Sequence, residues 1–120
     1  MMQIYNTLSG KKEDLNKALG GEKEIRLFVC GPTVYDSPHL GHARVAIFFD
    51  LAKKYLESLG YKINYLQNIT DVDDRIIERA HQEKKSPEEV ARAYEKEYNA
   101  AMEALGIKSV DGYPRASAHI

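Results

Sequence analysis

The sequence predicts an α/β fold built on one βαβ unit, in which a long helix connects two parallel strands. Two apolar runs carry this prediction: a short one at residues 25–30, and one at residues 62–69 in which apolar and polar residues alternate. Between them, residues 42–59 carry apolar side chains at helical spacing. Because a crossover between two strands of one sheet is almost always right-handed, these strands should lie parallel to each other.

The part of the chain before the first predicted core strand carries weaker signals. We expect a short strand at residues 4–8 and a helical turn at residues 11–19, which Gly20 and Gly21 end. The apolar run at residues 25–30 is typical of a buried parallel strand, and the Gly-Pro pair that follows it stops the strand.

The long helix is expected to begin near His39 to His42, after an irregular stretch at residues 33–38, and to run to Leu59. Seven of its residues fall at helical spacing on one broad apolar face: Val45, Phe48, Phe49, Ala52, Tyr55, Leu56 and Leu59. Gly60 stands where a glycine in the left-handed conformation commonly ends a helix.

Two further helices should follow the second strand. Thr70 and Asp73 have the spacing of a capping box, which predicts a helix that begins at Asp71. At residues 86–89, a serine N-cap, a proline at the first position and a glutamate at the third predict another helix, which Gly106 ends. The acidic residues after Thr70 fit a capping role better than a magnesium site, because the helix dipole favours negative charge at an N-terminus.

Composition limits the classes of function. The 120 residues form one domain or part of a larger one, and 43% hydrophobic and 29% charged residues are typical of a globular chain. A formal net charge of −1 is unlike a domain that grips nucleic acid by itself. The one cysteine allows no internal disulfide and suits the reducing cytoplasm. No apolar run approaches the roughly 20 residues of a membrane span, so we expect no membrane contact.

The residues from Cys30 to His42 carry the chemistry, because ligands of an open parallel sheet bind beyond the carboxyl ends of its strands. The first turn of the helix offers unpaired N–H groups and the positive end of a dipole to a phosphate. His39 and His42 are three apart, so both imidazoles face one side and can donate to phosphate oxygens, while Gly41 allows close approach. On spacing alone, two polar surface histidines at a helix start are the favoured interpretation, because short motifs match by chance.

Residues 30–44, CGPTVYDSPHLGHAR, resemble the signature of cysteinyl-tRNA synthetases, and HLGH within them resembles the HIGH motif of class I aminoacyl-tRNA synthetases, with leucine for isoleucine. Residues 5–8, 68–77 and 114–120 resemble the same family in the same order. The resemblance implies that residues 1–120 form the N-terminal part of a nucleotide-binding catalytic domain. That part would contain a partial Rossmann-like parallel sheet, with the first βαβ unit and the helices after it, and no complete second domain.

The resemblance also implies a reaction: ATP-dependent activation of cysteine to cysteinyl-adenylate and transfer of cysteine to tRNA(Cys) in the full-length enzyme. His39 and His42 would be the catalytic residues that hold the ATP phosphates, with Gly41 as a further ATP contact and Mg²⁺ accompanying ATP. Gly31 and Thr70 would contact the substrate cysteine, Thr70 near its amino group. The isolated chain is expected to be inactive and to bind tRNA weakly or not at all.

Cys30 has two interpretations. From its residue type alone, it is a small apolar residue buried at a strand end. The resemblance instead makes it a ligand of a zinc ion that also binds the substrate thiolate, a selective contact because zinc prefers sulfur to oxygen. Zinc needs about three protein ligands besides the substrate, and the family's others come from later segments, so the site would be incomplete in this chain.

Two other functions stay open from the sequence. The chain could belong to the cysteine ligase of mycothiol biosynthesis, which shares cysteine activation but joins cysteine to an amino sugar. It could also be a non-catalytic module that binds a nucleotide or a partner. The uncovered edge of such a short sheet predicts self-association.

Overall fold

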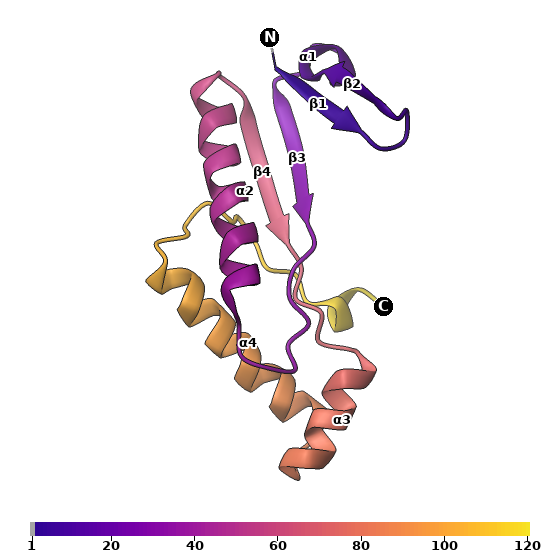
Figure 1. Cartoon of the computed structure of the whole chain (residues 1–120), viewed down its shortest axis with the longest axis vertical. Helices are drawn as coiled ribbons and strands as arrows, with labels where there is room; N and C mark the ends of the chain where they lie inside the picture. Colours follow the sequence, from indigo (N-terminus) through magenta and orange to yellow (C-terminus); the bar gives the residue numbers. More distant parts are fainter. Residues whose placement is uncertain (1) are drawn as a thin grey trace.

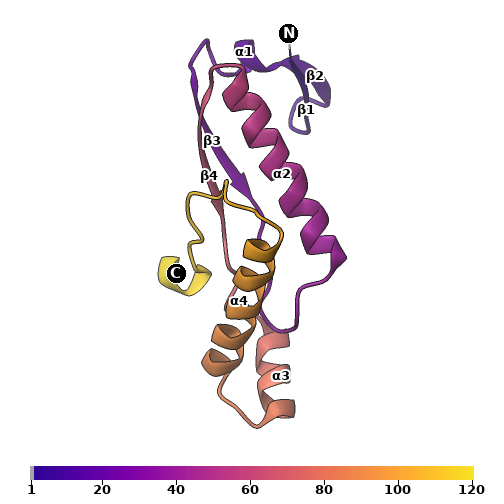
Figure 2. The same ribbon diagram turned by 90° about the vertical axis from the view of Figure 1, so that its left-hand side faces the viewer.

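The computed structural model describes residues 2–120, which form a parallel sheet with one covering helix, a helical hairpin and a small N-terminal strand hairpin (Figure 1). The elements are, in chain order, β1 (Gln3–Asn6), β2 (Lys11–Asp14), α1 (Leu15–Ala18), β3 (Glu24–Val29), α2 (Leu40–Ser58), β4 (Lys62–Gln67), α3 (Asp74–Glu83), α4 (Pro87–Ala104) and the 3₁₀ helix η1 (Ala116–His119). The molecule is elongated, 53 × 31 × 23 Å, because α3 extends it beyond the carboxyl ends of β3 and β4 (Figure 2).

Strands β3 and β4 pair in parallel over their full length, with α2 as the connection between them, which confirms the predicted βαβ unit. The core between α2 and the sheet consists of four buried residues: Val29, Leu56, Ile63 and Tyr65. Burial alternates along β4, so every second side chain points away from α2. We call that side, where Phe28 and Leu66 are exposed, the open face of the sheet.

A third parallel segment, residues 111–115, lies along the side of β4 that β3 does not occupy. Its main chain makes hydrogen bonds of 2.8, 3.1 and 2.8 Å with Tyr65, Gln67 and Ile69. β4 is therefore central and β3 is an edge strand, because no strand within residues 2–120 pairs with the outer side of β3. Aspartate, glycine and proline are not typical of a strand, so sequence patterns do not predict this segment.

Helices α3 and α4 pack against each other around a second core. Its buried members come from both helices and from the chain next to the strand ends, among them Val34, Ile69, Ile76, Val90, Tyr98 and Met102. Helix α4 begins with the predicted capping box, in which the Glu89 amide donates to the Ser86 hydroxyl at 3.2 Å and the Ser86 amide donates to the Glu89 carboxylate at 2.8 Å. No helix within residues 2–120 combines the length and apolar character needed to cross a membrane.

Residues 11–19 do not form one helical turn, contrary to the prediction. Lys11–Asp14 are strand β2, which pairs antiparallel with β1, and only Leu15–Ala18 form the short helix α1. Gly10 adopts a φ of 67°, which lets the chain reverse between the two strands. Because β2 is charged and largely exposed, apolar periodicity does not reveal it.

Helix α3 begins later than predicted. Asp73, not Thr70, is its N-cap and accepts a hydrogen bond from the Arg75 amide at 2.9 Å. Thr70 instead prolongs the line of β4 and forms a parallel bridge with Thr33, and its amide donates to the Pro32 carbonyl at 2.9 Å. The predicted N-cap, Thr70, is therefore wrong, because Thr70 pairs with Thr33 across the sheet.

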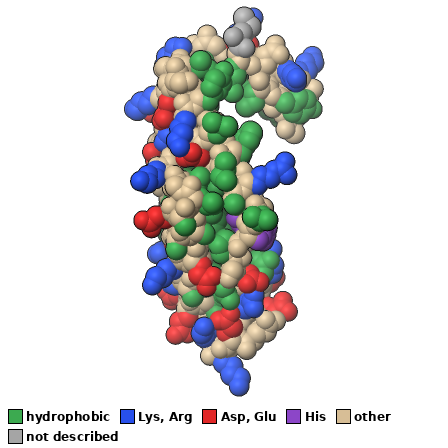
Figure 3. All heavy atoms as spheres, turned by 60° about the vertical axis from the view of Figure 1, so that its left-hand side comes forward, with side chains coloured by type: hydrophobic (Ala, Val, Ile, Leu, Met, Phe, Trp, Pro, Cys, Tyr) green, Lys and Arg blue, Asp and Glu red, His purple; other side chains and the backbone are tan. Residues whose placement is uncertain are grey.

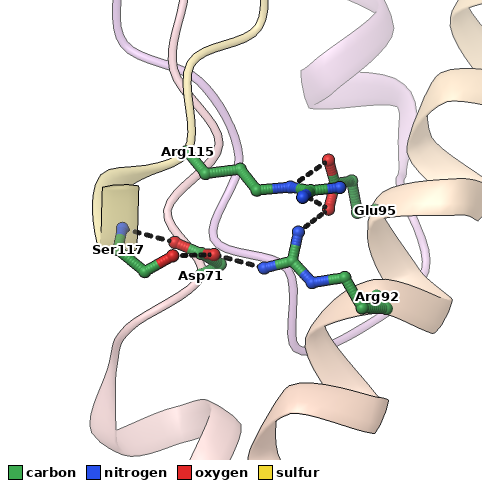
Figure 4. Close-up of polar contacts among 5 residues, drawn as sticks. All are labelled: Asp71, Arg92, Glu95, Arg115 and Ser117. Carbon is green, nitrogen blue, oxygen red and sulfur yellow. Dashed lines mark hydrogen bonds and ion pairs between the residues drawn. The ribbon is translucent and has the colours of Figure 1, made fainter. Parts of the chain in front are cut away.

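An ion network joins the end of β4, helix α4 and η1 (Figure 4). Asp71 accepts hydrogen bonds from the Ser117 amide at 2.9 Å and the Ser117 hydroxyl at 2.6 Å, and pairs with Arg92. Glu95 pairs with Arg92 and with Arg115, whose Nε lies 3.0 Å from Glu95 Oε1. Burial raises the pKa of Asp71, but the bonds from Ser117 and Arg92 outweigh it and hold that pKa below its usual value.

We expect Glu95→Gln to lower the free energy of unfolding by about 2 kcal/mol, because a neutral amide removes the charge that Arg92 and Arg115 share. Urea unfolding of both proteins at neutral pH measures the difference. Glu103→Gln, an exposed site on the same helix, is the matched control and should cost less than about 0.5 kcal/mol. Equal losses in the two variants would show that the network does not stabilise the fold.

Candidate functional site

The loop of residues 30–38 connects the end of β3 to the start of α2 and lies at the carboxyl ends of the strands (Figure 1). Both helices of the hairpin hold this loop. Arg79 of α3 pairs with Asp36 at 2.5 Å. The Ser37 hydroxyl donates to the Glu97 carboxylate of α4 at 2.7 Å. The loop is therefore fixed at the place where the sequence predicts nucleotide binding.

His39 and His42 cap the start of α2 reciprocally. The Gly41 amide donates to His39 Nδ1 at 3.0 Å, and the His39 amide donates to His42 Nδ1 at 3.1 Å. Because a backbone N–H can only donate, both Nδ1 atoms are acceptors, and each neutral ring carries its proton on Nε2. No group within residues 2–120 accepts a hydrogen bond from either Nε2, so the pair presents two donors to a ligand.

The two rings also lie against each other. Their centroids are 4.2 Å apart at an interplanar angle of 46°, and the Tyr98 ring meets the His42 ring edge-on at 6.1 Å. Partial burial, and then the neighbouring His39, lower the pKa of His42 below its ordinary value. At neutral pH His42 therefore stays in the uncharged form that the cap requires.

Gly41 is required by the cap itself. A Cβ at this position would lie 2.7 Å from His39 Cε1 and 2.9 Å from His39 Nδ1, too close for the ring to keep its hydrogen bond. The sequence suggests a different reason for this glycine, the close approach of a phosphate. The packing of the His39 ring explains it without a ligand, and the contact with ATP stays a prediction.

A polar cavity of about 290 Å³ opens beside the histidine pair. It is lined by Gly31, Thr33, His39, His42 and Arg75, among others. Arg75 was not identified from the sequence. Its guanidinium lies 4.8 Å from the centre of the Tyr35 ring, and Nη2 donates to the Thr33 hydroxyl at 3.3 Å. Asp73 pairs with Arg75 at 2.9 Å, so the charge of this cation is partly offset at the cavity wall.

Gly31 and Thr70, which the sequence assigns to the substrate cysteine, are joined through a third residue. The Gly31 amide donates to Asn68 Oδ1 at 2.8 Å, and Asn68 Nδ2 donates to Thr70 Oγ1 at 3.0 Å. A Cβ on Gly31 would lie 1.6 Å from the Asn68 carbonyl oxygen, so only glycine fits where the chains cross. The sequence does not identify Asn68, because nothing in the residues around it indicates that its side chain binds the Gly31 amide, 37 residues earlier in the chain.

Cys30 is exposed, which contradicts the interpretation as a buried apolar residue. Its thiol makes one long contact, 3.7 Å, with the Gly31 carbonyl. Within residues 2–120, no three histidine, cysteine, aspartate or glutamate side chains come together as metal ligands. Since zinc needs about three protein ligands, these residues do not fit a zinc site by themselves, and we assign no chemical step to zinc.

The titration of His42 should make the fold less stable in acid. Its folded pKa lies below the unfolded value of 6.5, so the unfolded chain binds the proton first as the pH falls through that value. We therefore expect a lower free energy of unfolding at about pH 5.5 than at about pH 7.5. His42→Gln keeps an acceptor for the His39 amide without titrating, and it should reduce this pH dependence.

Urea unfolding at both pH values measures the effect, and NMR titration of the imidazoles reports the pKa of His42 directly. An identical pH dependence in the wild type and in His42→Gln would contradict the prediction. So would a measured pKa of His42 above 6.5.

A solved structure of Mycobacterium tuberculosis methionyl-tRNA synthetase in complex with methionyl-adenylate matches 80% of the chain and 19% of that protein, with a TM-score of 0.75. At 21% identity, this match establishes a shared fold and no more. It confirms the expected class I synthetase architecture, with a parallel sheet and helices.

Sequence comparison is more specific. The chain is 50% identical over 119 residues to the cysteine–tRNA ligase of Archaeoglobus fulgidus and 47% identical over 120 residues to that of Pyrococcus furiosus. These matches cover 99% and 100% of the chain but 25% of each relative, so the chain spans about a quarter of their length. A family model described as the class I (C) tRNA synthetase catalytic domain matches residues 17–120. The chain belongs to this family of class I tRNA synthetases.

Proposed function

We propose that the chain forms the ATP side and part of the cysteine side of a cysteine–tRNA ligase. The family-length protein would activate cysteine with ATP to cysteinyl-adenylate and transfer it to tRNA(Cys). The observation that carries this proposal is the reciprocal cap, because it turns the Nε2–H groups of His39 and His42 away from the helix as donors beside the polar cavity.

The histidine pair suits adenylate formation. In that reaction the carboxylate of cysteine attacks the α-phosphorus of ATP and pyrophosphate leaves, so negative charge gathers on phosphate oxygens. Two neutral donors fixed by the backbone stabilise this charge without reorganising. Mg²⁺ would accompany ATP. Asp36, which lines the cavity, is already paired with Arg79, and Asp73 is paired with Arg75, so we assign Mg²⁺ no protein ligand here.

The cysteine side would use Gly31 and Thr70. Cys30 would contribute one thiolate to a zinc ion whose other ligands residues 2–120 do not supply. A formal net charge of −1 is unlike a domain that binds RNA by itself, so tRNA(Cys) binding would depend on the rest of a family-length protein.

Replacing both His39 and His42 with alanine in the family-length protein should slow cysteine-dependent ATP–pyrophosphate exchange by about 100-fold or more, because two phosphate donors are lost. His81→Ala, which removes an exposed histidine of α3, is the control and should leave exchange unchanged. The 120-residue chain alone should show little or no exchange. Unchanged exchange in the double variant would refute the role of the histidine pair. A separate assay of the wild type distinguishes the two reactions, because transfer of cysteine to tRNA(Cys) identifies a tRNA ligase and transfer to an amino sugar identifies the alternative ligase.

The isolated chain should self-associate. On the side where α2 lies, hydrophobic side chains form a band on the surface (Figure 3), and Ile47, Phe48 and Leu51 of α2 are 50%, 61% and 65% exposed. Together with the unpaired edge of β3, this apolar surface favours dimers or larger species. Light scattering at increasing protein concentration should show a rising mass. A monomer at all concentrations, with a cooperative thermal transition, would contradict this expectation.

A further inference from the structure

We infer that Asn68 is a positioning residue of the cysteine site. Its side chain holds the Thr70 hydroxyl so that one lone pair of the hydroxyl oxygen stays free to accept a hydrogen bond from the ammonium group of the substrate. The inference rests on the proposed function, in which Thr70 lies near the amino group of cysteine. It adds a residue with no assigned role in that function and states what this residue does to Thr70.

The orientation of the Asn68 amide follows from its contact with Gly31. The Gly31 N–H can only donate, and it lies 2.8 Å from Asn68 Oδ1, so this atom is the carbonyl oxygen of the side chain. The amide NH₂ therefore faces Thr70 Oγ1 at 3.0 Å. Because an NH₂ group can only donate, the hydroxyl oxygen of Thr70 must accept this bond.

The hydrogen bond from Asn68 determines what Thr70 offers a ligand. A hydroxyl oxygen has two lone pairs, and Asn68 occupies one of them. The second stays available, and an ammonium group, which has only donors, is the matching partner. Among residues 2–120, Asn68 is the one residue that hydrogen-bonds the Thr70 hydroxyl, so the direction of that lone pair depends on Asn68.

The main chain of Thr70 is held independently of Asn68. The Thr70 amide donates to the Pro32 carbonyl at 2.9 Å, and the Val34 amide donates to the Thr70 carbonyl at 3.1 Å. The preceding residue, Ile69, is fully buried. A substitution of Asn68 should therefore release the hydroxyl of Thr70 without displacing its backbone, which separates the positioning role from a role in folding.

The test is the Michaelis constant for cysteine in ATP–pyrophosphate exchange by the family-length protein. Asn68→Leu has a similar volume but neither hydrogen bond, and should raise KM for cysteine about tenfold while KM for ATP stays unchanged. Asn68→Asp keeps an acceptor for Gly31 and holds the hydroxyl by accepting its proton, so its KM for cysteine should not exceed that of the wild type. Asn64→Ala, an exposed asparagine of β4, is the matched control and should have no effect.

A double-mutant cycle shows whether Asn68 acts through Thr70. In a Thr70→Val background, Asn68→Leu should raise KM for cysteine no further, because the hydroxyl that it releases is already gone. Additive effects would overturn the inference, and so would an unchanged KM for cysteine in Asn68→Leu alone while the wild type is active. A wild type without cysteine-dependent exchange would overturn the proposed function, and this inference with it. If Asn68→Leu does not fold, Asn68→Ala, which leaves room for a water beside the Gly31 amide, replaces it.

Discussion

The candidate site depends on how closely two strand ends cross. A Cβ on Gly31 would lie 1.6 Å from the Asn68 carbonyl oxygen, so the first segment can pass the second only with a glycine. The Gly31 amide then reaches the Asn68 side chain, 37 residues away, and the two chains continue in parallel to the bridge between Thr33 and Thr70. The loop of residues 30–38 begins at this close approach, and Gly31 and Thr33 line the cavity together with His39 and His42 at the start of α2.

Charged contacts, beside the apolar core, orient the helical hairpin at this crossing. Asp71 and Glu95 are buried carboxylates that share Arg92, and they bind the end of the third parallel segment and η1 through Arg115 and Ser117 (Figure 4). Removing two charges from water is costly, so such pairs add less stability than apolar contacts of the same area. They are directional, however, and a hairpin held by them has one orientation. That orientation holds Arg79 of α3 and Glu97 of α4 in contact with the loop of residues 30–38.

The sequence reveals the elements that have a local signal. Apolar runs identify β3 and β4, and the serine, proline and glutamate at residues 86–89 identify the start of α4. The third parallel segment is hidden because it contains aspartate, glycine and proline, which are not typical of a strand. Thr70 is wrongly predicted as an N-cap because threonine is common both at helix N-caps and in strands, so its residue type does not distinguish the two. Asn68 and Arg75 are missed for a related reason, since their partners, Gly31 and Thr33, are distant in the sequence.

The two sides of the candidate site are built in different ways, and this determines what each needs. The ATP side is local: His39 and His42 cap one helix end, so their geometry is set once α2 forms. The proposed cysteine side is assembled from distant segments, since Gly31 and Thr70 are joined through Asn68, and within residues 2–120 Cys30 belongs to no group of three metal-ligating side chains. A phosphate can be held by fixed donors alone, whereas selection of a thiol through zinc needs several ligands. Under the proposed function, the ATP side would therefore keep its form within these residues, while selection of cysteine through zinc would require ligands that residues 2–120 do not bring together.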